Sequence, residues 1–298
     1  MATPLNFYIV DVFSNEQVRN SGNQLAVFDC SQNPIADSEM QAIAGEINFS
    51  ETTFIMPHTA GEGPVPVRIF TPRSELAFAG HPTLGTSYVA KNILHLSGKE
   101  SVQLALKAGT FQIEVDSQGL FWVQQLSPTF GEALDAKLVA KSLSIPESYI
   151  DHRFPIQETS TGLSHIIVPL NSLEAIKSAH IERETYYKLI SRMQAKSILV
   201  FTPETYLTES DFNVRVFIEY YGLPEDAATG SGAGCLGAYL SKHNFEQTTR
   251  NNSIILEQGY EMGRPSQLFV QTDKKGNEII VSVGGKVKLI AEGKWYVS

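Results

Sequence analysis

A strand–turn–helix pattern occurs twice in this chain, once in each half. The first copy begins with Val-Arg-Ile-Phe at residues 67–70 and leads through Gly80 into a stretch rich in small and apolar residues. The second begins with Val-Arg-Val-Phe at residues 214–217 and leads through Gly230 into a similar stretch. The copies lie roughly 150 residues apart, so the pattern favours two similar halves, each with its own core, over one undivided core.

Each copy is expected to form a strand, a glycine-containing turn and a helix, so that each half presents one helix N-terminus. The N-terminus of a helix carries a partial positive charge and free N–H groups, and both favour a bound anion. We therefore expect a cleft between the two halves that holds an anion and allows chemistry beside it.

Short β-branched or aromatic runs, bounded by Gly, Pro, Asn or Asp, dominate the chain and predict strands. Helical patterns are fewer, and they are expected at residues 37–47, 82–94, 133–143, 182–194 and 232–243. Ser127 and Pro128 break the strand pattern, which predicts a domain boundary near residues 125–134. The expected fold class is therefore α+β, with the strands of each half wrapped around one apolar helix.

Composition limits the classes of partner. A net charge of −9 and a pI near 5.3 argue against a nucleic-acid partner and against an anionic membrane surface. No apolar stretch approaches the roughly 18 residues that span a bilayer, and the N-terminus lacks the cationic region of a signal peptide. The two cysteines, Cys30 and Cys235, do not resemble a disulfide framework, so a cytoplasmic location is expected.

His81 is the first candidate for chemistry. It lies between Gly80, which allows a sharp bend, and Pro82, which suits the first turn of a helix. The positive helix end is expected to lower the pKa of His81 and to keep the imidazole neutral as a proton carrier. The alternative is a capping histidine without a catalytic role.

Residues 225–234 offer a richer candidate. Ser231 and neighbouring glycines such as Gly232 can present a hydroxyl and backbone N–H groups to a carboxylate or an oxyanion. Asp226 lies shortly before them and can reach back over the same place. The alternative is an acidic loop with a helix cap, in which the glycines serve only tight helix packing.

Other patterns carry less information. Residues 232–237 satisfy G-x-G-x-x-G, but no strand leads directly into the first glycine, so we do not expect a dinucleotide site. The histidines and cysteines show no metal-ligand spacing, so no metal is expected. Glu51, at a strand edge, is typical of a solvated surface residue, and Arg68 and Arg215 are expected to stiffen the twin strands through local ion pairs.

The chain resembles the PhzF-type phenazine-biosynthesis isomerases, which share their fold with diaminopimelate epimerase. The resemblance covers nearly the whole chain. It is carried by Gly22-Asn23 with residues 25–28, Ser50-Glu51-Thr52-Thr53-Phe54, residues 70–72, Glu75-Leu76, Phe78-Ala79-Gly80-His81-Pro82, residues 225–231, Gln258-Gly259 and residues 263–266.

This resemblance implies two pseudo-symmetric halves, each a mixed β-sheet curled around a central α-helix. It also implies that a last strand near residues 286–297 returns to the first half. The expected N-terminal half is then 1–126 joined by the C-terminal strand 284–298, and the C-terminal half is 127–283. A homodimer without metal or organic cofactor is implied as well.

The resemblance also assigns site residues. It implies that Glu51 is the acid/base that moves a proton between substrate carbons. His81 and Asp226 are then its proton-handling partners. The implied substrate-binding groups are Ser50, Gly80, Ser231 and Gly232.

The expected function is thus a cofactor-independent isomerase that acts on a small carboxylate-bearing metabolite, trans-2,3-dihydro-3-hydroxyanthranilate or a related compound. Residues 158–165, which help shape the substrate pocket in such proteins, differ from those of the phenazine enzyme. One alternative is a non-catalytic metabolite-binding or scaffold protein of the same fold. Another is an amino-acid racemase or epimerase, although Cys30 and Cys235 do not occupy the turns where the epimerases place their two catalytic thiols.

Overall fold

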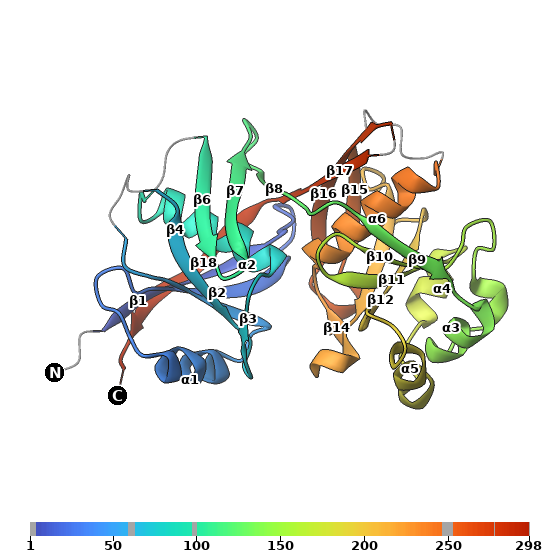
Figure 1. Cartoon of the computed structure of the whole chain (residues 1–298), viewed down its shortest axis with the longest axis horizontal. Helices are drawn as coiled ribbons and strands as arrows, with labels where there is room; N and C mark the ends of the chain where they lie inside the picture. The colour runs from blue at the N-terminus through green and yellow to red at the C-terminus, as the bar shows by residue number, and fades with distance from the viewer. Residues whose placement is uncertain (1–3, 59–62, 97–99, 246–252, 277, 298) are drawn as a thin grey trace. The chain divides into compact units, whose positions relative to one another are not determined.

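The structure is a computed structural model that describes residues 4–58, 63–96, 100–245, 253–276 and 278–297. Its internal contacts divide the chain into two compact units, Met1–Val123 with Gly284–Ser298, and Gln124–Val283. The first unit therefore contains both ends of the described chain, and the second unit is built from one continuous segment. Figure 1 shows the elements of both units.

The first unit is mostly sheet. β1 pairs antiparallel with β2 and with β18, so the last strand (red in Figure 1) lies beside the first strand (blue). β2 runs parallel to β3, and β4 pairs antiparallel with β3 and β5 and parallel with β6. β7 then pairs antiparallel with β6 and with β8. The elements are β1 (Leu5–Val12), β2 (Asn23–Asp29), α1 (Asp37–Ile47), β3 (Glu51–Ile55), β4 (Val65–Phe70), β5 (Glu75–Leu76), α2 (Gly80–Asn92), β6 (Ser101–Leu106), β7 (Gly109–Val115), β8 (Phe121–Gln124) and β18 (Val287–Trp295).

The second unit repeats this topology. β10 pairs antiparallel with β9 and β11, β11 runs parallel to β12, and β12 pairs antiparallel with β13. β13 pairs antiparallel with β14 and parallel with β15, which pairs with β16. The elements are β9 (Thr129–Ala133), α3 (Ala136–Ser142), η1 (Glu147–Tyr149), β10 (Gln157–Ser160), β11 (Ser164–Pro169), α4 (Leu173–Ser178), α5 (Arg183–Ile190), β12 (Ser197–Thr202), β13 (Phe212–Phe217), η2 (Glu219–Tyr221), β14 (Glu225–Asp226), α6 (Gly230–Lys242), β15 (Ser253–Gln258), η3 (Tyr260–Met262), β16 (Ser266–Lys275) and β17 (Glu278–Gly285).

One helix is central to each unit. α2 contacts β1, β2, β3 and β6, and α6 contacts β10, β11 and β16 (Figure 1). Most residues of both helices are buried, which agrees with their small and apolar composition and with a hydrophobic pattern that runs all around the helix. The expected α+β fold with a sheet around a central helix in each half is confirmed.

Glycine allows these helices to approach the strands closely. A Cβ atom on Gly85 of α2 would lie 2.6 Å from Leu25 Cδ2, and one on Gly237 of α6 would lie 2.5 Å from Val270 Cγ1. The G-x-G-x-x-G pattern at residues 232–237 lies wholly inside α6, so it forms no phosphate-binding turn. Its glycines lie close to neighbouring side chains, so they serve helix packing, which is the alternative that the sequence left open.

Several predicted helix boundaries are wrong. α2 begins at Gly80 because Ala79 is the N-cap, so Pro82 is the third helical residue; it is still within the first turn, where an N–H lacks a partner. α6 likewise begins at Gly230, two residues before the predicted start. The helix predicted at residues 133–143 begins only at Ala136, because β9 ends at Ala133 and the Asp135 side chain caps α3 by accepting from the Leu138 N–H.

The region between β11 and β12 also differs from the prediction. Besides α5, which is shorter than residues 182–194, it contains the unpredicted helix α4. The hydroxyl of Ser172 caps α4 by accepting from the Ala175 N–H, and this local signal could have predicted the helix. No helix in the described ranges is long and apolar enough to span a membrane.

Candidate active site

Glu51 and His81 are in contact in the first unit. Glu51 is the first residue of β3, and His81 is the second residue of α2. Glu51 Oε2 lies 3.5 Å from His81 Nε2, and the two side chains are 18% and 7% exposed. The sequence pattern alone places Glu51 at the surface. The fold instead brings it into contact with the buried His81. Ser50 precedes Glu51 directly, and Gly80 precedes His81.

Burial controls the charge of His81. Loss of hydration lowers the pKa of His81 to about 3, and a hydrogen bond with the backbone of Gln24 opposes this shift. The imidazole is therefore neutral near pH 7, as the sequence predicts. The main cause of the lowered pKa is burial, which the sequence did not predict, and the contribution of the helix N-terminus stays a prediction.

Paired arginines stiffen the turns that lead into the two central helices. Arg68 Nε donates to Glu75 Oε1 at 2.8 Å, and Arg215 Nη2 donates to Glu225 Oε2 at 2.8 Å. Glu75 and Glu225 begin the two-residue strands β5 and β14 that lead toward α2 and α6. The predicted local ion pairs of Arg68 and Arg215 are confirmed.

The second unit places Asp226 in a tightly bonded turn. Asp226 is 9% exposed, and its Oδ2 accepts from the Thr229 hydroxyl at 2.5 Å. Gln258, at the end of β15, donates to the Asp226 carbonyl at 2.8 Å and accepts from the Thr229 N–H at 3.0 Å. Gly259 follows with φ +80°, and a Cβ there would lie 2.6 Å from the Ala227 carbonyl oxygen. Gln258 and Gly259 therefore fix the turn that carries Asp226.

Ser231 contacts a histidine that the site prediction did not include. Ser231 is the second residue of α6, and its Oγ lies 3.0 Å from His165 Nε2. His165 Nδ1 in turn lies 2.7 Å from Ser197 Oγ. An extension of the internal repeat upstream to residues 25–28 and 165–168 would have drawn attention to His165.

The cysteines do not support a two-thiol racemase. Cys30 and Cys235 are both buried and unpaired with each other. Burial raises the pKa of the Cys30 thiol to about 12 and that of the Cys235 thiol to about 11. A catalytic thiolate is therefore disfavoured at both positions, and the expectation that they are buried apolar residues is confirmed.

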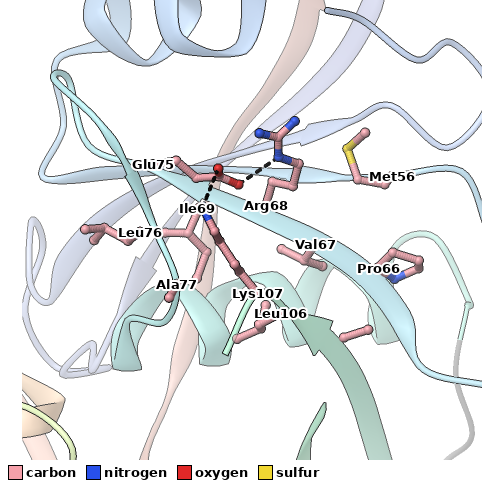
Figure 2. A pocket seen from close by; sticks show the side chains of 11 residues that line it. Met56, Pro66, Val67, Arg68, Ile69, Glu75, Leu76, Ala77, Leu106 and Lys107 are labelled. Atoms are coloured by element: carbon pink, nitrogen blue, oxygen red, sulfur yellow. Dashed lines mark hydrogen bonds and ion pairs between the residues drawn. The ribbon is translucent and has the colours of Figure 1, made fainter. Parts of the chain in front are cut away.

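A surface hollow of about 340 Å³ lies elsewhere in the first unit. Its polar residues already satisfy one another, because Glu75 accepts from both Arg68 and Lys107 (Figure 2). Glu51 and His81 do not line it. We therefore assign it no role in the chemistry.

The predicted site residues fall into one group in each unit. Glu51 and His81 lie together in the first unit, with Ser50 and Gly80 beside them in sequence. Asp226, Ser231 and Gly232 lie in the second unit, at the turn and N-terminus that lead into α6. A common cleft for both groups stays a prediction. Among the described residues, no group of three or more His, Cys, Asp or Glu side chains could hold a metal ion.

The fold of this chain is shared with a solved structure of another protein. Over 99% of this chain and 93% of the other, it is similar to the crystal structure of a probable proline racemase from Agrobacterium radiobacter, with a TM-score of 0.61 at 9% identity. This level of identity shows a shared fold alone. The chain thus has the mixed-sheet fold found among racemases and epimerases.

The sequence defines the family. The pattern of the PhzC-PhzF family, described as phenazine biosynthesis-like protein, matches residues 10–293. Trans-2,3-dihydro-3-hydroxyanthranilate isomerase of Pseudomonas aeruginosa is 31% identical over 98% of this chain and 99% of its own. A PhzF-family phenazine biosynthesis protein of Bacillus anthracis has a TM-score of 0.89 at 26% identity, over 99% of this chain and all of the other. This chain belongs to the PhzC-PhzF family and is an isomerase, so the resemblance is confirmed.

Proposed function

We propose that this isomerase moves a proton between two carbons of a small carboxylate-bearing metabolite, with Glu51 as the acid/base. The contact of 3.5 Å between Glu51 Oε2 and His81 Nε2 is the observation that carries the proposal. Trans-2,3-dihydro-3-hydroxyanthranilate, or a related compound, is the proposed substrate. A relative that is 31% identical is named as the isomerase of that compound.

In the proposed reaction, Glu51 removes a proton from one carbon and returns it to another. One C–H bond breaks, another forms, and the double bond between them shifts, so the step needs no oxidant or reductant. A single carboxylate can serve both carbons if each lies within hydrogen-bond reach.

His81 has a supporting part in this proposal. Its pKa of about 3 means that the ring does not take the proton from the Glu51 carboxyl group near pH 7. Nε2 is buried, and within the described residues no hydrogen bond to it is formed. An unprotonated Nε2 can then accept from the Glu51 O–H while the proton is held there, which stabilises the protonated carboxyl group.

The remaining site residues are proposed to bind and orient the substrate. Ser50 and the amide of Gly80 adjoin the Glu51 group, and Ser231 and the amide of Gly232 adjoin the first turn of α6. Asp226 is proposed as a second proton-handling group, because it is buried and carries a bonded carboxylate. The homodimer and the cytoplasmic location stay predictions.

The test is turnover of trans-2,3-dihydro-3-hydroxyanthranilate in D₂O, followed by proton NMR. The native protein should convert the compound, and deuterium should appear at the receiving carbon where the proton held by Glu51 exchanges with solvent before it is returned. Glu51→Gln keeps the size of the side chain but removes the base, so kcat should fall by about 100-fold or more.

Glu46→Gln is the matched control, because Glu46 is an exposed residue of the preceding helix α1. It should retain the native rate. A native rate in Glu51→Gln would show that Glu51 is not the base. Tight binding of the compound by the native protein without conversion would instead favour a metabolite-binding protein.

A further inference from the structure

The register of the strands matches two positions of the first unit with two of the second. Leu25 of β2 pairs with Glu51 of β3, and His165 of β11 pairs with Ser197 of β12. Thr52 pairs with Phe70, and Ile198 pairs with Phe217 of the repeated Val-Arg pattern. Glu51 therefore corresponds to Ser197, and Leu25 corresponds to His165.

The central helices add the third position. His81 is the second residue of α2, and Ser231 is the second residue of α6. The place of the Glu51–His81 pair is thus taken in the second unit by two serines, Ser197 and Ser231. The histidine lies on the neighbouring strand, where the first unit has Leu25.

His165 joins the two serines. Its Nδ1 lies 2.7 Å from Ser197 Oγ, and its Nε2 lies 3.0 Å from Ser231 Oγ. His165 is 1% exposed and Ser197 is fully buried, whereas Ser231 is partly exposed at the start of α6. The three side chains form a line of hydrogen bonds that leads from the interior to the helix N-terminus.

The charge state of the ring limits how this line can be arranged. Burial lowers the pKa of His165 to about 4, so the neutral ring donates from one nitrogen and accepts at the other. Ser197 has a single hydroxyl proton, which can be donated to His165 Nδ1 at 2.7 Å or to the Ser164 carbonyl at 3.4 Å. The shorter contact favours donation to the ring.

Whether Ser197 or the His165 ring is the donor determines the direction of all the hydrogen bonds in this line. If Ser197 donates to Nδ1, the ring carries its proton on Nε2 and donates it to Ser231 Oγ. The hydroxyl proton of Ser231 then remains available for another acceptor. In the opposite arrangement Ser231 would donate to His165 and could not offer that proton to an anion.

We propose that Ser197 and His165 form a relay that orients the Ser231 hydroxyl as a hydrogen-bond donor to a carboxylate or oxyanion of the substrate. His165 and Ser197 are positioning residues, since they act through Ser231. This inference rests on the proposed function in one respect only, namely the assignment of Ser231 to substrate binding.

The first test observes the ring itself. Long-range proton–nitrogen NMR of protein labelled with ¹⁵N-histidine distinguishes a protonated from an unprotonated ring nitrogen, and the spectrum of His165→Gln assigns the His165 signals among the seven histidines. In the free protein at pH 7 we expect the proton on Nε2. A proton on Nδ1 in the free protein would overturn the relay.

The second test measures binding of 3-hydroxyanthranilate, an aromatic carboxylate of similar size to the proposed substrate, by titration calorimetry. Ser197→Ala should raise Kd about fivefold, in keeping with one misdirected hydrogen bond. Ser231→Ala should raise Kd at least as much, and the double variant should bind like Ser231→Ala alone, because Ser197 acts only through Ser231.

Ser142→Ala is the matched control. Ser142 is also a buried serine of the second unit, but its hydroxyl donates to the Val139 carbonyl inside α3. It should leave Kd unchanged. Additive losses in the double variant would overturn the relay, as would a native protein that fails to bind 3-hydroxyanthranilate at millimolar concentration.

These tests separate the two proposals, because neither needs turnover. If the Ser197 and Ser231 effects are coupled but Glu51→Gln retains the native rate, the relay stands and the proposed base is wrong. If Glu51→Gln loses activity and the serine effects are additive, the proposed base stands and the relay is wrong.

Discussion

Arg68 and Arg215 occupy the same place in the two copies, yet their surroundings differ. The Arg68 side chain is 24% exposed and binds Glu75 and the exposed carboxylate of Asp37. The Arg215 side chain is 9% exposed, as is its partner Glu225. Arg215 also donates through Nη1 to the carbonyls of Ile176 and Ala179 near the end of α4. The second arginine thus satisfies several buried acceptors at once.

Removal of Arg215 should therefore be costly. We expect Arg215→Met to lower the free energy of unfolding by about 3 kcal/mol or more, because a buried carboxylate and two carbonyls lose their donor. Arg68→Met should cause a smaller loss, since water can replace the guanidinium beside Asp37. Urea unfolding of the two variants measures the difference, and equal losses would contradict this explanation.

At the scale of single residues, the sequence identified Glu51 only through the family resemblance. A glutamate that begins a strand is usually solvated, and nothing in its neighbours shows that His81 lies 3.5 Å away. His165 was included only in the pocket-shaping stretch 158–165 and was given no role of its own, because its neighbours in sequence are strand residues. Its two serine partners lie on β12 and α6.

At the scale of elements, the helix interiors were predictable and several helix ends were not. α1 spans residues 37–47 as predicted, because its pattern and its start are local features of the sequence. α2 and α6 begin two residues early, since the turn after β5 or β14 decides where the helix starts. That turn is fixed by strand pairing, which a local pattern does not contain.

Two helical glycines provide a test at this scale. A Cβ on Gly45 of α1 would meet its nearest neighbour, the Pro72 carbonyl oxygen, at an ordinary 3.7 Å. A Cβ on Gly85 of α2 would lie 2.6 Å from Leu25 Cδ2 and 2.8 Å from Val12 Cγ2. Gly45→Ala should raise the free energy of unfolding by about 0.5–1 kcal/mol through helix propensity.

Gly85→Ala should have the opposite effect, because overpacking costs about 1–3 kcal/mol and outweighs the gain in propensity. Urea midpoints of the two variants, compared with the native protein, check both signs. A stabilised Gly85→Ala would show that the strands around α2 can move apart without strain.

At the scale of the whole molecule, the buried histidines link stability to pH. The unfolded chain binds a proton at each histidine below about pH 6.5, whereas the folded pKa is about 3 for His81 and about 4 for His165. Below pH 6.5 the unfolded state therefore binds more protons, so stability is complete above this pH and is lost as the pH falls. Each histidine should remove about 2 kcal/mol of unfolding free energy between pH 7 and pH 5.

Urea unfolding at pH 7, 6 and 5 measures this slope. This window lies above the range in which the carboxylates with lowered pKa, such as Glu75 and Asp151, take up protons. His81→Gln should reduce the slope, whereas His180→Gln, a change at an exposed histidine, should not. An unfolding free energy that stays constant from pH 7 to pH 5 would contradict the buried neutral state of both rings.

The sequence by itself determined the duplicated organisation, the fold class and the family of this protein. Those features depend on local periodicity, on glycine and proline at turns, and on motifs in a fixed order, all of which can be read along one chain. Only the tertiary structure decided that Glu51 contacts His81, that His165 joins Ser197 to Ser231, and that the glycines of α6 serve packing. These contacts depend on the register of strands and on the depth of burial, which are set when segments far apart in sequence pack together.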